Sequence, residues 1–528
     1  MGAKEIIEEG KAYLGIEFGS TRIKGVVCDE TGNVLAMGGY GWENSYIDGI
    51  WTYSEKEIFD GLKACYADVV KDIGGKYGIS VKRFAGIGIS AMMHGYLAFD
   101  ANDNLLVPFR TWRNTITGEA AEKLTSEFDY NIPQRWSISH LYQAMLNKEE
   151  HVKDVAFFTT LAGFVHWRLT GKKVLGVGDA SGMFPIDTAT GNYDAGMIAK
   201  FDLLAKDTAL GRGLKDLLPE VLSAGKEAGT LTKEGAALLD ESGLLEEGIP
   251  LCPPEGDAGT GMVATNSVKV RTGNISAGTS VFAMVVLEKE LSKVYPEIDL
   301  VTTPDGALVG MVHCNNCTSE INNWVRIFKE FCGVYGIDPD MNDLYMKLYS
   351  VSLKGEEDCG GVILYNYLSG EPVTGFEKGA LVLARTAEDN FSLANLMRSN
   401  LYSAMATLKI GLDLMLKEEG VKVDEMYGHG GYFKTKGVGT KVAAAAINAP
   451  VSVMETASEG GAWGIALLAA YLDKKQEMTL SEYLSGVIFK NAKCEKCEPE
   501  QKDVDGFDKY IKKYKTGLAV ERTAVEVL

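Results

Sequence analysis

The sequence predicts an α/β protein built from two domains of the same design. With 528 residues, the chain exceeds the roughly 250 to 300 residues at which single hydrophobic cores stop growing. Its apolar fraction of 46% and charged fraction of 24% are typical of folded globular proteins. Strand patterns alternate with helical patterns in the first half, and the opening pattern recurs near the middle of the chain. Together these observations favour a duplicated α/β fold.

The first predicted elements are three strands joined by hairpin turns over residues 13–40. A Gly-Ser-Thr turn separates the first two apolar runs, and a Thr-Gly-Asn turn separates the second from the third. A helix is predicted over residues 54–74, with Ser54 as its N-cap. A short apolar strand at residues 84–90 follows, which completes the α/β pattern.

The second half opens with the same arrangement. From Val268 the chain reads as strand, glycine with hydroxyl residues, and strand again. Gly19 of the first turn and Gly278 of the second lie about half the chain length apart, which predicts an internal duplication. A glycine-rich turn follows a strand at 426–435, and glycines lead into an alanine-rich apolar helix at 458–472.

We place the domain boundaries where these patterns change. Residues 1–13 form an N-terminal extension, 14–266 the first domain and 267–475 the second. Residues 476–528 are charged and are predicted to form a tail with at least one helix packed on the outside.

Charge and composition exclude several classes of partner. The net charge of −19, with scattered Lys and Arg, argues against binding to nucleic acid or to anionic membranes. No segment reaches about 18 uninterrupted apolar residues, and the acidic N-terminus lacks the features of a signal peptide. A cytoplasmic location is therefore expected.

The nine cysteines are expected to be reduced. An odd number spread over a long chain is not typical of a secreted disulfide framework. Two C-x-x-C pairs, Cys314/Cys317 and Cys494/Cys497, lack the spacing of a zinc ribbon.

The glycine and hydroxyl turns are candidate phosphate sites. Such a turn directs main-chain N–H groups and hydroxyls to one spot, which suits a polyphosphate. The alternative for each turn is an ordinary hairpin. The sequence has neither a P-loop nor a dinucleotide-binding G-x-G-x-x-G motif, so a nucleotide would be held by another architecture.

Asp257 is the candidate general base. It follows an apolar strand and lies between Gly256 and Gly259, which allow other groups to approach the carboxylate closely. A carboxylate fixed at a strand end can accept the proton of a hydroxyl that attacks a phosphoryl group. The alternative is that Asp257 caps the following helix.

A sugar site is predicted at the ends of the first-half strands. His94 lies just after a strand and could donate a hydrogen bond to a sugar hydroxyl, although a structural histidine is the alternative. Trp112, Arg113 and Asn114 combine an aromatic face with polar groups, a mixture that suits a sugar, although Trp112 could be a core residue.

With these residues in place, the chain resembles the FGGY family of carbohydrate kinases, and within it is similar to the xylulokinases. The motifs stand in the family's order over residues 14–475: Gly15-Ile16-Glu17-Phe18-Gly19-Ser20, Met93-His94-Gly95, Gly256-Asp257-Ala258, Gly278-Thr279-Ser280, Tyr367 to Glu371, and Gly428, Gly430 and Gly431.

The resemblance implies an actin-like, ribonuclease H-like fold of two duplicated ATPase domains with a central cleft. It also implies ATP and Mg²⁺ as cofactors, a ketopentose such as D-xylulose as acceptor, and Asp257 as the base. The implied sugar contacts are Met93, His94, Trp112, Arg113, Asn114 and Asp257. The implied nucleotide contacts are Gly19, Ser20, Thr21, Lys24, Gly278, Thr279, Ser280, Gly430 and Gly431.

Some positions depart from the family pattern. Glu17 stands where the family usually has aspartate, and is expected to hold magnesium directly or through water. Met92 stands where xylulokinases usually have glutamine, and Arg113-Asn114 where they usually have Asn-Asp. Arg113 would suit a carboxylate on the substrate or pair with a neighbouring acid. L-Ribulose, a polyol and a sugar acid therefore stay open as acceptors, as do a non-catalytic regulator and a homodimer.

Overall fold

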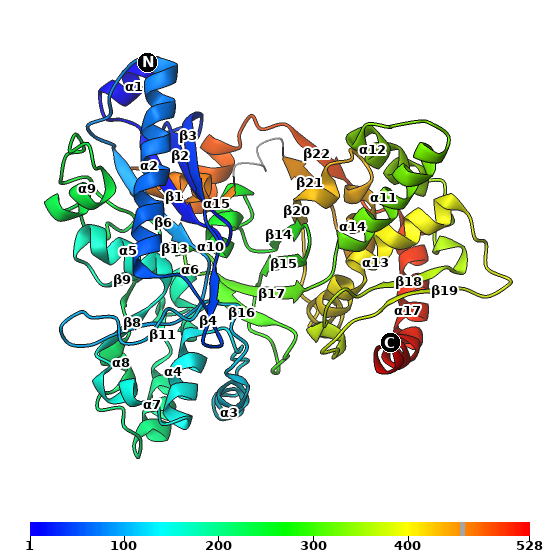
Figure 1. Ribbon diagram of the computed structural model, residues 1–528, viewed down its shortest axis with the longest axis horizontal. Coiled ribbons are helices and arrows are strands. Elements are labelled where there is room, and N and C mark those ends of the chain that lie inside the picture. The colour runs from blue at the N-terminus through cyan, green and yellow to red at the C-terminus, as the bar shows by residue number, and fades with distance from the viewer. Residues whose placement is uncertain (455–459) are drawn as a thin grey trace. The chain divides into compact units, whose positions relative to one another are not determined.

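The computed structural model describes residues 1–454 and 460–528, and its contacts divide the chain into two units (Figure 1). Of the described residues, unit 1 holds 1–268, 299–309 and 460–491. Unit 2 holds 269–298, 310–454 and 492–528. The first change of unit lies close to the predicted boundary after residue 266, whereas the later changes were not predicted.

The sheet of unit 1 begins with the predicted three-stranded meander. Its strands are β1 (Tyr13–Phe18), β2 (Arg22–Cys28), β3 (Val34–Gly41), β6 (Gly86–Ala91) and β13 (Glu255–Gly256), in the order β3-β2-β1-β6-β13. The first three are antiparallel, whereas β6 runs parallel to β1, and β13 parallel to β6. Helix α2 (Glu55–Tyr77) lies along β2 and β3 (Figure 1). Ser54 is its N-cap, as predicted.

Unit 2 repeats this arrangement. The strands β14 (Thr272–Ala277), β15 (Val281–Val286), β17 (Leu308–Cys314), β20 (Glu425–His429), β21 (Val451–Met454) and β22 (Cys494–Cys497) lie in the order β17-β15-β14-β20-β21-β22. The first two residues of β17 are assigned to unit 1 and the rest to unit 2. As β1 and β2 do in unit 1, β14 and β15 form an antiparallel hairpin. Strand β20 runs parallel to β14, and β21 runs parallel to β20. The duplication predicted from the two turns is confirmed.

Helices complete each unit. Unit 1 contains α3 (Gly118–Phe128), α4 (Ser137–Leu146), α5 (Leu161–Thr170), α6 (Val177–Ala180), α7 (Ala195–Ala205), α9 (Lys233–Leu239) and α10 (Asp257–Ala264), with the small hairpin β4 (Ser45–Ile47) and β5 (Ile50–Thr52). Unit 2 contains α11 (Ser319–Val334), α12 (Met341–Ser352), α13 (Leu393–Asp413), α14 (Gly439–Ile447) and the hairpin β18 (Ile363–Asn366) and β19 (Leu381–Ala384).

Helix α15 (Gly460–Tyr471) belongs to unit 1, although the sequence placed it in the second domain. It packs directly on β1 and β6. A Cβ atom on Gly15 would lie 2.1 Å from the Ala462 carbonyl oxygen, so only glycine allows this approach. The boundary predicted at residue 475 is therefore not a boundary between the units, because an apolar helix from late in the chain covers the first sheet.

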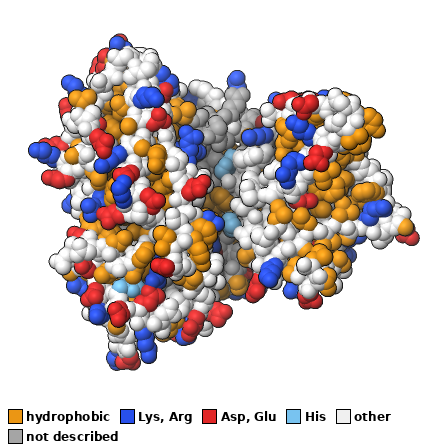
Figure 2. Space-filling view, in the orientation of Figure 1, with side chains coloured by type: hydrophobic (Ala, Val, Ile, Leu, Met, Phe, Trp, Pro, Cys, Tyr) orange, Lys and Arg blue, Asp and Glu red, His pale blue; other side chains and the backbone are white. Residues whose placement is uncertain are grey.

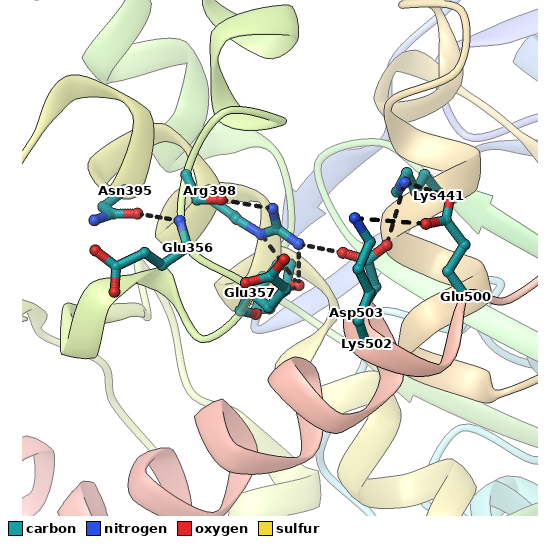
Figure 3. A network of polar contacts seen from close by, with 10 residues as sticks. Glu356, Glu357, Asn395, Arg398, Lys441, Glu500, Lys502 and Asp503 are labelled. Atoms are coloured by element: carbon teal, nitrogen blue, oxygen red, sulfur yellow. Dashed lines mark hydrogen bonds and ion pairs between the residues drawn. The ribbon is translucent and has the colours of Figure 1, made fainter.

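The predicted tail helix, α17 (Gln501–Val527), is present and buries one face in unit 2. Phe507, Tyr510 and Tyr514 on this helix are buried. Figure 3 shows how its start is fixed, since Arg398 of α13 forms a 2.6 Å ion pair with Asp503 of α17. Tail residues before 492 instead belong to unit 1.

Charges of both signs are mixed on the face in Figure 2, and the cysteines are free. On the face in Figure 2, Lys and Arg are scattered among Asp and Glu and form no single basic patch. All nine cysteines are described and free of disulfides. Over residues 1–454 and 460–528, no cluster of three or more His, Cys, Asp or Glu is arranged to hold a metal ion. Nor is any helix within those ranges long and apolar enough to cross a membrane.

Candidate active site

Asp257 opens helix α10 of unit 1. Gly256, rather than Asp257, is the N-cap residue, so the capping alternative is not what the structure shows. The Asp257 Oδ1 atom accepts a hydrogen bond of 3.2 Å from the backbone N–H of Met93, just after β6. Burial raises the pKa of Asp257 to about 6, against the opposing effect of backbone hydrogen bonds from Met93 and Ala258. At neutral pH the carboxylate is therefore mostly ionised, as a base must be.

Glu17 is a second carboxylate near Asp257. On β1 it lies opposite Lys24 of β2, and it accepts a hydrogen bond from the backbone of Ala462 at the start of α15. Burial and the neighbouring Asp257 raise its pKa to about 7, while Lys24 opposes this shift. A Cβ atom on Gly461 would lie 2.3 Å from Glu17 Oε1, so the glycine makes room for this carboxylate.

Two further buried acids, Asp179 and Glu255, were missed in the sequence. Glu255 accepts hydrogen bonds from the backbone N–H groups of Asp179 (2.9 Å) and Gly178 (3.3 Å) at α6. Asp179 accepts one of 2.6 Å from the Thr160 hydroxyl, and its other oxygen has no partner among the described residues. Burial raises the pKa of Asp179 to about 7 and that of Glu255 well above its usual range. Of these two acids, only Glu255 could have been suspected from the sequence, because it lies two positions before Asp257.

His94 follows Met93, whose N–H binds Asp257, and has an unusual backbone conformation. Its φ of 69° is uncommon for a residue other than glycine. The Nδ1 atom lies 3.0 Å from the Gly182 carbonyl oxygen, which can only accept, so Nδ1 carries the proton. Burial and then Arg135 lower the His94 pKa to about 3, so the ring is neutral and Nε2 is an acceptor. His94 therefore cannot donate through Nε2, contrary to the expectation from the sequence.

Arg113 and Asn114 both contact Trp51 of the β4–β5 hairpin. The Asn114 side chain is buried and pairs with the Trp51 backbone, through 2.9 Å bonds at both its oxygen and its nitrogen. The Arg113 guanidinium lies 4.0 Å from the Trp51 ring centroid and donates to Asn44 Oδ1 at 3.1 Å. Among the described residues, Arg113 therefore makes no ion pair with a neighbouring acid, which was one of its two predicted roles.

Aromatic side chains hold the first predicted phosphate turn. Trp42 Nε1 donates to the Gly19 carbonyl at 2.7 Å, and the Tyr53 hydroxyl donates to the Ser20 carbonyl at 2.6 Å. Trp112, which is 38% exposed, donates to the Ser20 hydroxyl at 3.3 Å. Trp112 is thus not a core residue, and the structure brings it to the first turn.

The second turn is held from a different segment. Gly278 N–H donates to the Ser280 carbonyl at 2.9 Å, which closes the turn. The Gly278 carbonyl accepts from the Thr318 N–H at 3.0 Å and hydroxyl at 2.7 Å. The Thr279 carbonyl accepts from Cys317 N–H at 3.0 Å. The carbonyl oxygens of Gly278 and Thr279 are thus bound by residues 317 and 318, and the Gly278 N–H is used within the turn. This favours the remaining N–H groups and the hydroxyls of the turn as the groups that would bind a ligand.

The structure also brings Gly430 to this turn. Its φ is 101°, and a Cβ atom there would lie 2.4 Å from the Ala277 carbonyl oxygen, so this position requires glycine. Gly431 follows it in open space, because a Cβ atom added there would meet no described atom within 4 Å. Two of the three predicted groups of nucleotide contacts therefore meet in unit 2.

Comparison with known proteins identifies the family. A model of the FGGY family of carbohydrate kinases, N-terminal domain, matches residues 12–264, and its C-terminal domain model matches residues 273–472. The chain belongs to the FGGY family of carbohydrate kinases. It is a sugar kinase with the two-domain, actin-like fold of that family, as the motifs implied.

The relatives of this FGGY kinase include several sugar kinases at low identity. A xylulose kinase of Haemophilus influenzae is 22% identical over 96% of this chain and 99% of its own. The structure of a ligand-bound xylulose kinase from Lactobacillus acidophilus matches with a TM-score of 0.78 at 18% identity, covering 96% of this chain and 98% of that one. A gluconate kinase from the same organism also matches at 0.78 and 18%, covering 98% and 99%. Such likeness shows the fold and leaves the acceptor open.

Proposed function

We propose that this FGGY kinase transfers the γ-phosphoryl group of ATP to a hydroxyl of a ketopentose, with D-xylulose as the favoured acceptor and D-xylulose 5-phosphate as the product. The observation that carries the proposal is the carboxylate of Asp257, held by Met93 N–H with a pKa of about 6. The Met93-His94-Gly95 motif and the similarity to xylulose kinases support the choice of acceptor.

The proposed chemistry is an in-line displacement. The acceptor oxygen forms a bond to the γ-phosphorus while the bond from that phosphorus to the β–γ bridging oxygen breaks, and ADP leaves with the bonding electrons. The hydroxyl proton passes to the Asp257 carboxylate. Rate enhancement comes mainly from positioning and from neutralising the phosphate charge.

Both turns and Lys24 are the proposed nucleotide contacts. The residues that would contact the polyphosphate are Gly19, Ser20, Thr21, Lys24, Gly278, Thr279, Ser280, Gly430 and Gly431. Mg²⁺ fits the acid pair of unit 1, because burial and then the neighbouring Asp257 raise the pKa of Glu17, and a cation would offset both effects. Glu17 would hold Mg²⁺, directly or through water, and the ion would supply charge neutralisation on the phosphates.

His94 sharpens the choice of acceptor. In a neutral ring whose Nε2 carries no proton, Nε2 accepts a hydrogen bond from a sugar hydroxyl but repels a carboxylate. We therefore rank neutral sugars above a sugar acid. The Arg113 guanidinium is already placed over Trp51, so it gives the sugar acid less support than the sequence suggested.

The test is ADP formation from Mg·ATP with D-xylulose, L-xylulose, D-ribulose, L-ribulose, glycerol, erythritol and D-gluconate at equal concentration. D-Xylulose is expected to give the highest rate. Asp257→Asn should fold normally and lose about 10³-fold or more in kcat, since it removes the proton acceptor. Asp187→Asn, at the end of β10 (Ile186–Asp187) in unit 1, is the matched control and should keep its rate. Near-normal turnover by Asp257→Asn would exclude it as the base.

A further inference from the structure

The segment after β17 is the direct support of the second phosphate turn. Cys317 and Thr318, consecutive residues of this segment, bind the carbonyl oxygens of Thr279 and Gly278 through bonds of 2.7 to 3.0 Å. Any shift of the segment would therefore move the turn. The position of the turn depends on what fixes this segment in unit 2.

A single buried carboxylate fixes the start of the segment. Glu371 is 0% exposed. Its Oε2 atom accepts from Asn315 N–H at 3.1 Å, Asn316 N–H at 3.3 Å and Asn316 Nδ2 at 3.2 Å. Hydrogen bonds to an ionised acceptor are stronger than those between neutral groups, and three donors converge here. Two consecutive backbone amides thus point at one oxygen atom.

The Asn316 side chain ties the same segment to the chain that carries Glu371. Its Oδ1 atom accepts from the N–H groups of Leu368 (2.9 Å) and Ser369 (3.1 Å), and its Nδ2 atom donates to the Ser369 carbonyl at 3.2 Å. Glu371 is itself fixed, because its backbone pairs with Phe376 at 2.7 and 3.1 Å. Hydrogen bonds therefore connect Phe376, through Glu371 and Asn316, to the segment that holds the turn. We call this chain of hydrogen bonds the relay.

We propose that Glu371 is a positioning residue for the nucleotide: through Asn315 and Asn316 it sets the segment that holds Gly278 and Thr279 against the ATP phosphates. This inference rests on the proposed function, since it assigns the second turn to ATP. Glu371 is fully buried, so it would act through residues 315–318 and not by contact with a substrate. Its role is to fix the direction of the turn's N–H groups before ATP binds.

The carboxylate is suited to this role in a way that an amide is not. Asn315 N–H also lies 3.4 Å from Glu371 Oε1, so this one donor is shared between the two oxygen atoms. Glutamine at this position would have one acceptor oxygen and an NH₂ group, and the NH₂ group would oppose the N–H of Asn315. Burial raises the pKa of Glu371 to about 7, while the bonds from Asn316 and Asn315 oppose that shift.

A matched control is present in the same unit. Glu521 of α17 is also 0% exposed and accepts one backbone hydrogen bond, from Ala380 N–H at 2.8 Å. Glu521→Gln therefore makes the same chemical change in the same unit, at a carboxyl group whose backbone donor lies outside residues 315–318 and outside the turn. Any general loss of stability should be shared by the two variants.

The experiment measures ATP binding to the full chain in the presence of Mg²⁺ by titration calorimetry, together with KM for ATP and for the acceptor. Glu371→Gln is expected to raise the Kd and KM for ATP about tenfold, the effect of losing one charge-assisted bond, while KM for the acceptor stays within about twofold. Glu521→Gln should leave all three values close to those of the wild type.

Equal ATP affinity in Glu371→Gln and Glu521→Gln would overturn the inference and leave the proposed function intact. A wild-type chain that binds no ATP would overturn both. If Glu371→Gln does not fold, Asn316→Ala replaces it, because this variant removes the side-chain link and keeps the carboxylate. An unchanged ATP affinity in Asn316→Ala would also overturn the relay.

Discussion

The two turns that are proposed to bind phosphate are alike in their bound carbonyl oxygens and differ in the residues that hold them. In each, the first two carbonyl oxygens accept hydrogen bonds from elsewhere in the same unit. In unit 1 the donors are the side chains of Trp42 and Tyr53, whose rings stack with centroids 4.0 Å apart. In unit 2 the donors are Cys317 and Thr318, mostly through their backbone. The two turns therefore have corresponding acceptors and different donors.

This difference predicts that the two turns respond to different kinds of substitution. The first turn has one side-chain donor for each carbonyl, so a single substitution leaves a carbonyl unpaired. The second turn has a double donor at Gly278, but its support runs through buried polar groups. Unit 1 should therefore respond most to loss of an aromatic donor, and unit 2 to loss of a buried charge.

The largest expected effect is at the buried ion pair of unit 2 in Figure 3. The side chains of Arg398 and Asp503 are 7% and 4% exposed. Arg398→Met leaves the Asp503 charge buried, with Lys441 at 3.2 Å as its remaining ion-pair partner among the described residues, and should lower the free energy of unfolding by about 3 to 5 kcal/mol. Urea unfolding followed by circular dichroism measures this change.

The control for this prediction is Lys123→Met, at an exposed pair with Glu119, which should leave the urea midpoint unchanged. The double variant Arg398→Met with Asp503→Leu should recover part of the loss, because no charge is then left buried. Equal midpoints for Arg398→Met and Lys123→Met would show that unit 2 does not depend on its buried charges.

In unit 1, Trp42→Phe keeps an aromatic ring and removes the donor to the Gly19 carbonyl. The unpaired carbonyl should cost about 1 to 3 kcal/mol and raise the KM for ATP about tenfold. Trp463→Phe is the control, since Trp463 donates to the Gly32 carbonyl at 2.9 Å and is also buried. Loss of stability in both variants, with a change in KM for ATP in the control as well, would contradict a specific role for Trp42.

The local parts of this comparison could be predicted from the sequence. Strand alternation and turn residues depend on neighbours in the chain, so the hairpins around Gly19 and Gly278 and the N-cap at Ser54 were placed correctly. The order of the motifs was enough to identify the family. Asp257 was also located at a strand end, where the structure has it.

The supporting groups could not be predicted, because they come from segments far apart in the chain. Nothing in the pattern around Trp42 or Glu371 shows that these side chains hold a turn. The same holds for Asp179 and Glu255, which meet only in the fold. The tautomer of His94 depends on the Gly182 carbonyl, and so reversed the predicted direction of its hydrogen bond.

Asp179 in unit 1 and Glu371 in unit 2 are both buried carboxyl groups, but their surroundings differ. Glu371 is surrounded by donors, whereas one oxygen of Asp179 has no partner among the described residues. Burial raises the pKa of Asp179 to about 7, against about 3.9 in the unfolded chain. Between these values the folded state binds one more proton, so the stability contributed by Asp179 falls by about 1.4 kcal/mol per pH unit as pH rises from 4 to 7.

Asp179→Asn removes this titration. Relative to the wild type, the variant should therefore gain stability steadily as pH rises from 5 to 7 and then keep a constant difference up to pH 8. Urea unfolding at four pH values measures the trend. Parallel curves for the two proteins would show that Asp179 is ionised in the fold and has a partner that offsets its burial.

The smallest effect is expected at Thr318, and it tests the redundancy of the second turn. Thr318 is the N-cap residue of α11, yet its hydroxyl bonds to the Gly278 carbonyl and makes no cap hydrogen bond to the helix. Thr318→Val keeps the shape and the N–H donor at 3.0 Å, so the carbonyl stays paired. The KM for ATP should rise only about two- to threefold, the effect of about 0.5 kcal/mol.

Thr516→Val is the control, because it removes a hydroxyl that bonds to the Lys512 carbonyl at an exposed position of α17. If Thr318→Val instead raised the KM for ATP as much as Trp42→Phe, one remaining donor would not be sufficient at Gly278. The two turns would then depend equally on every donor, and the difference between them would lie only in the type of residue that supplies the hydrogen bond.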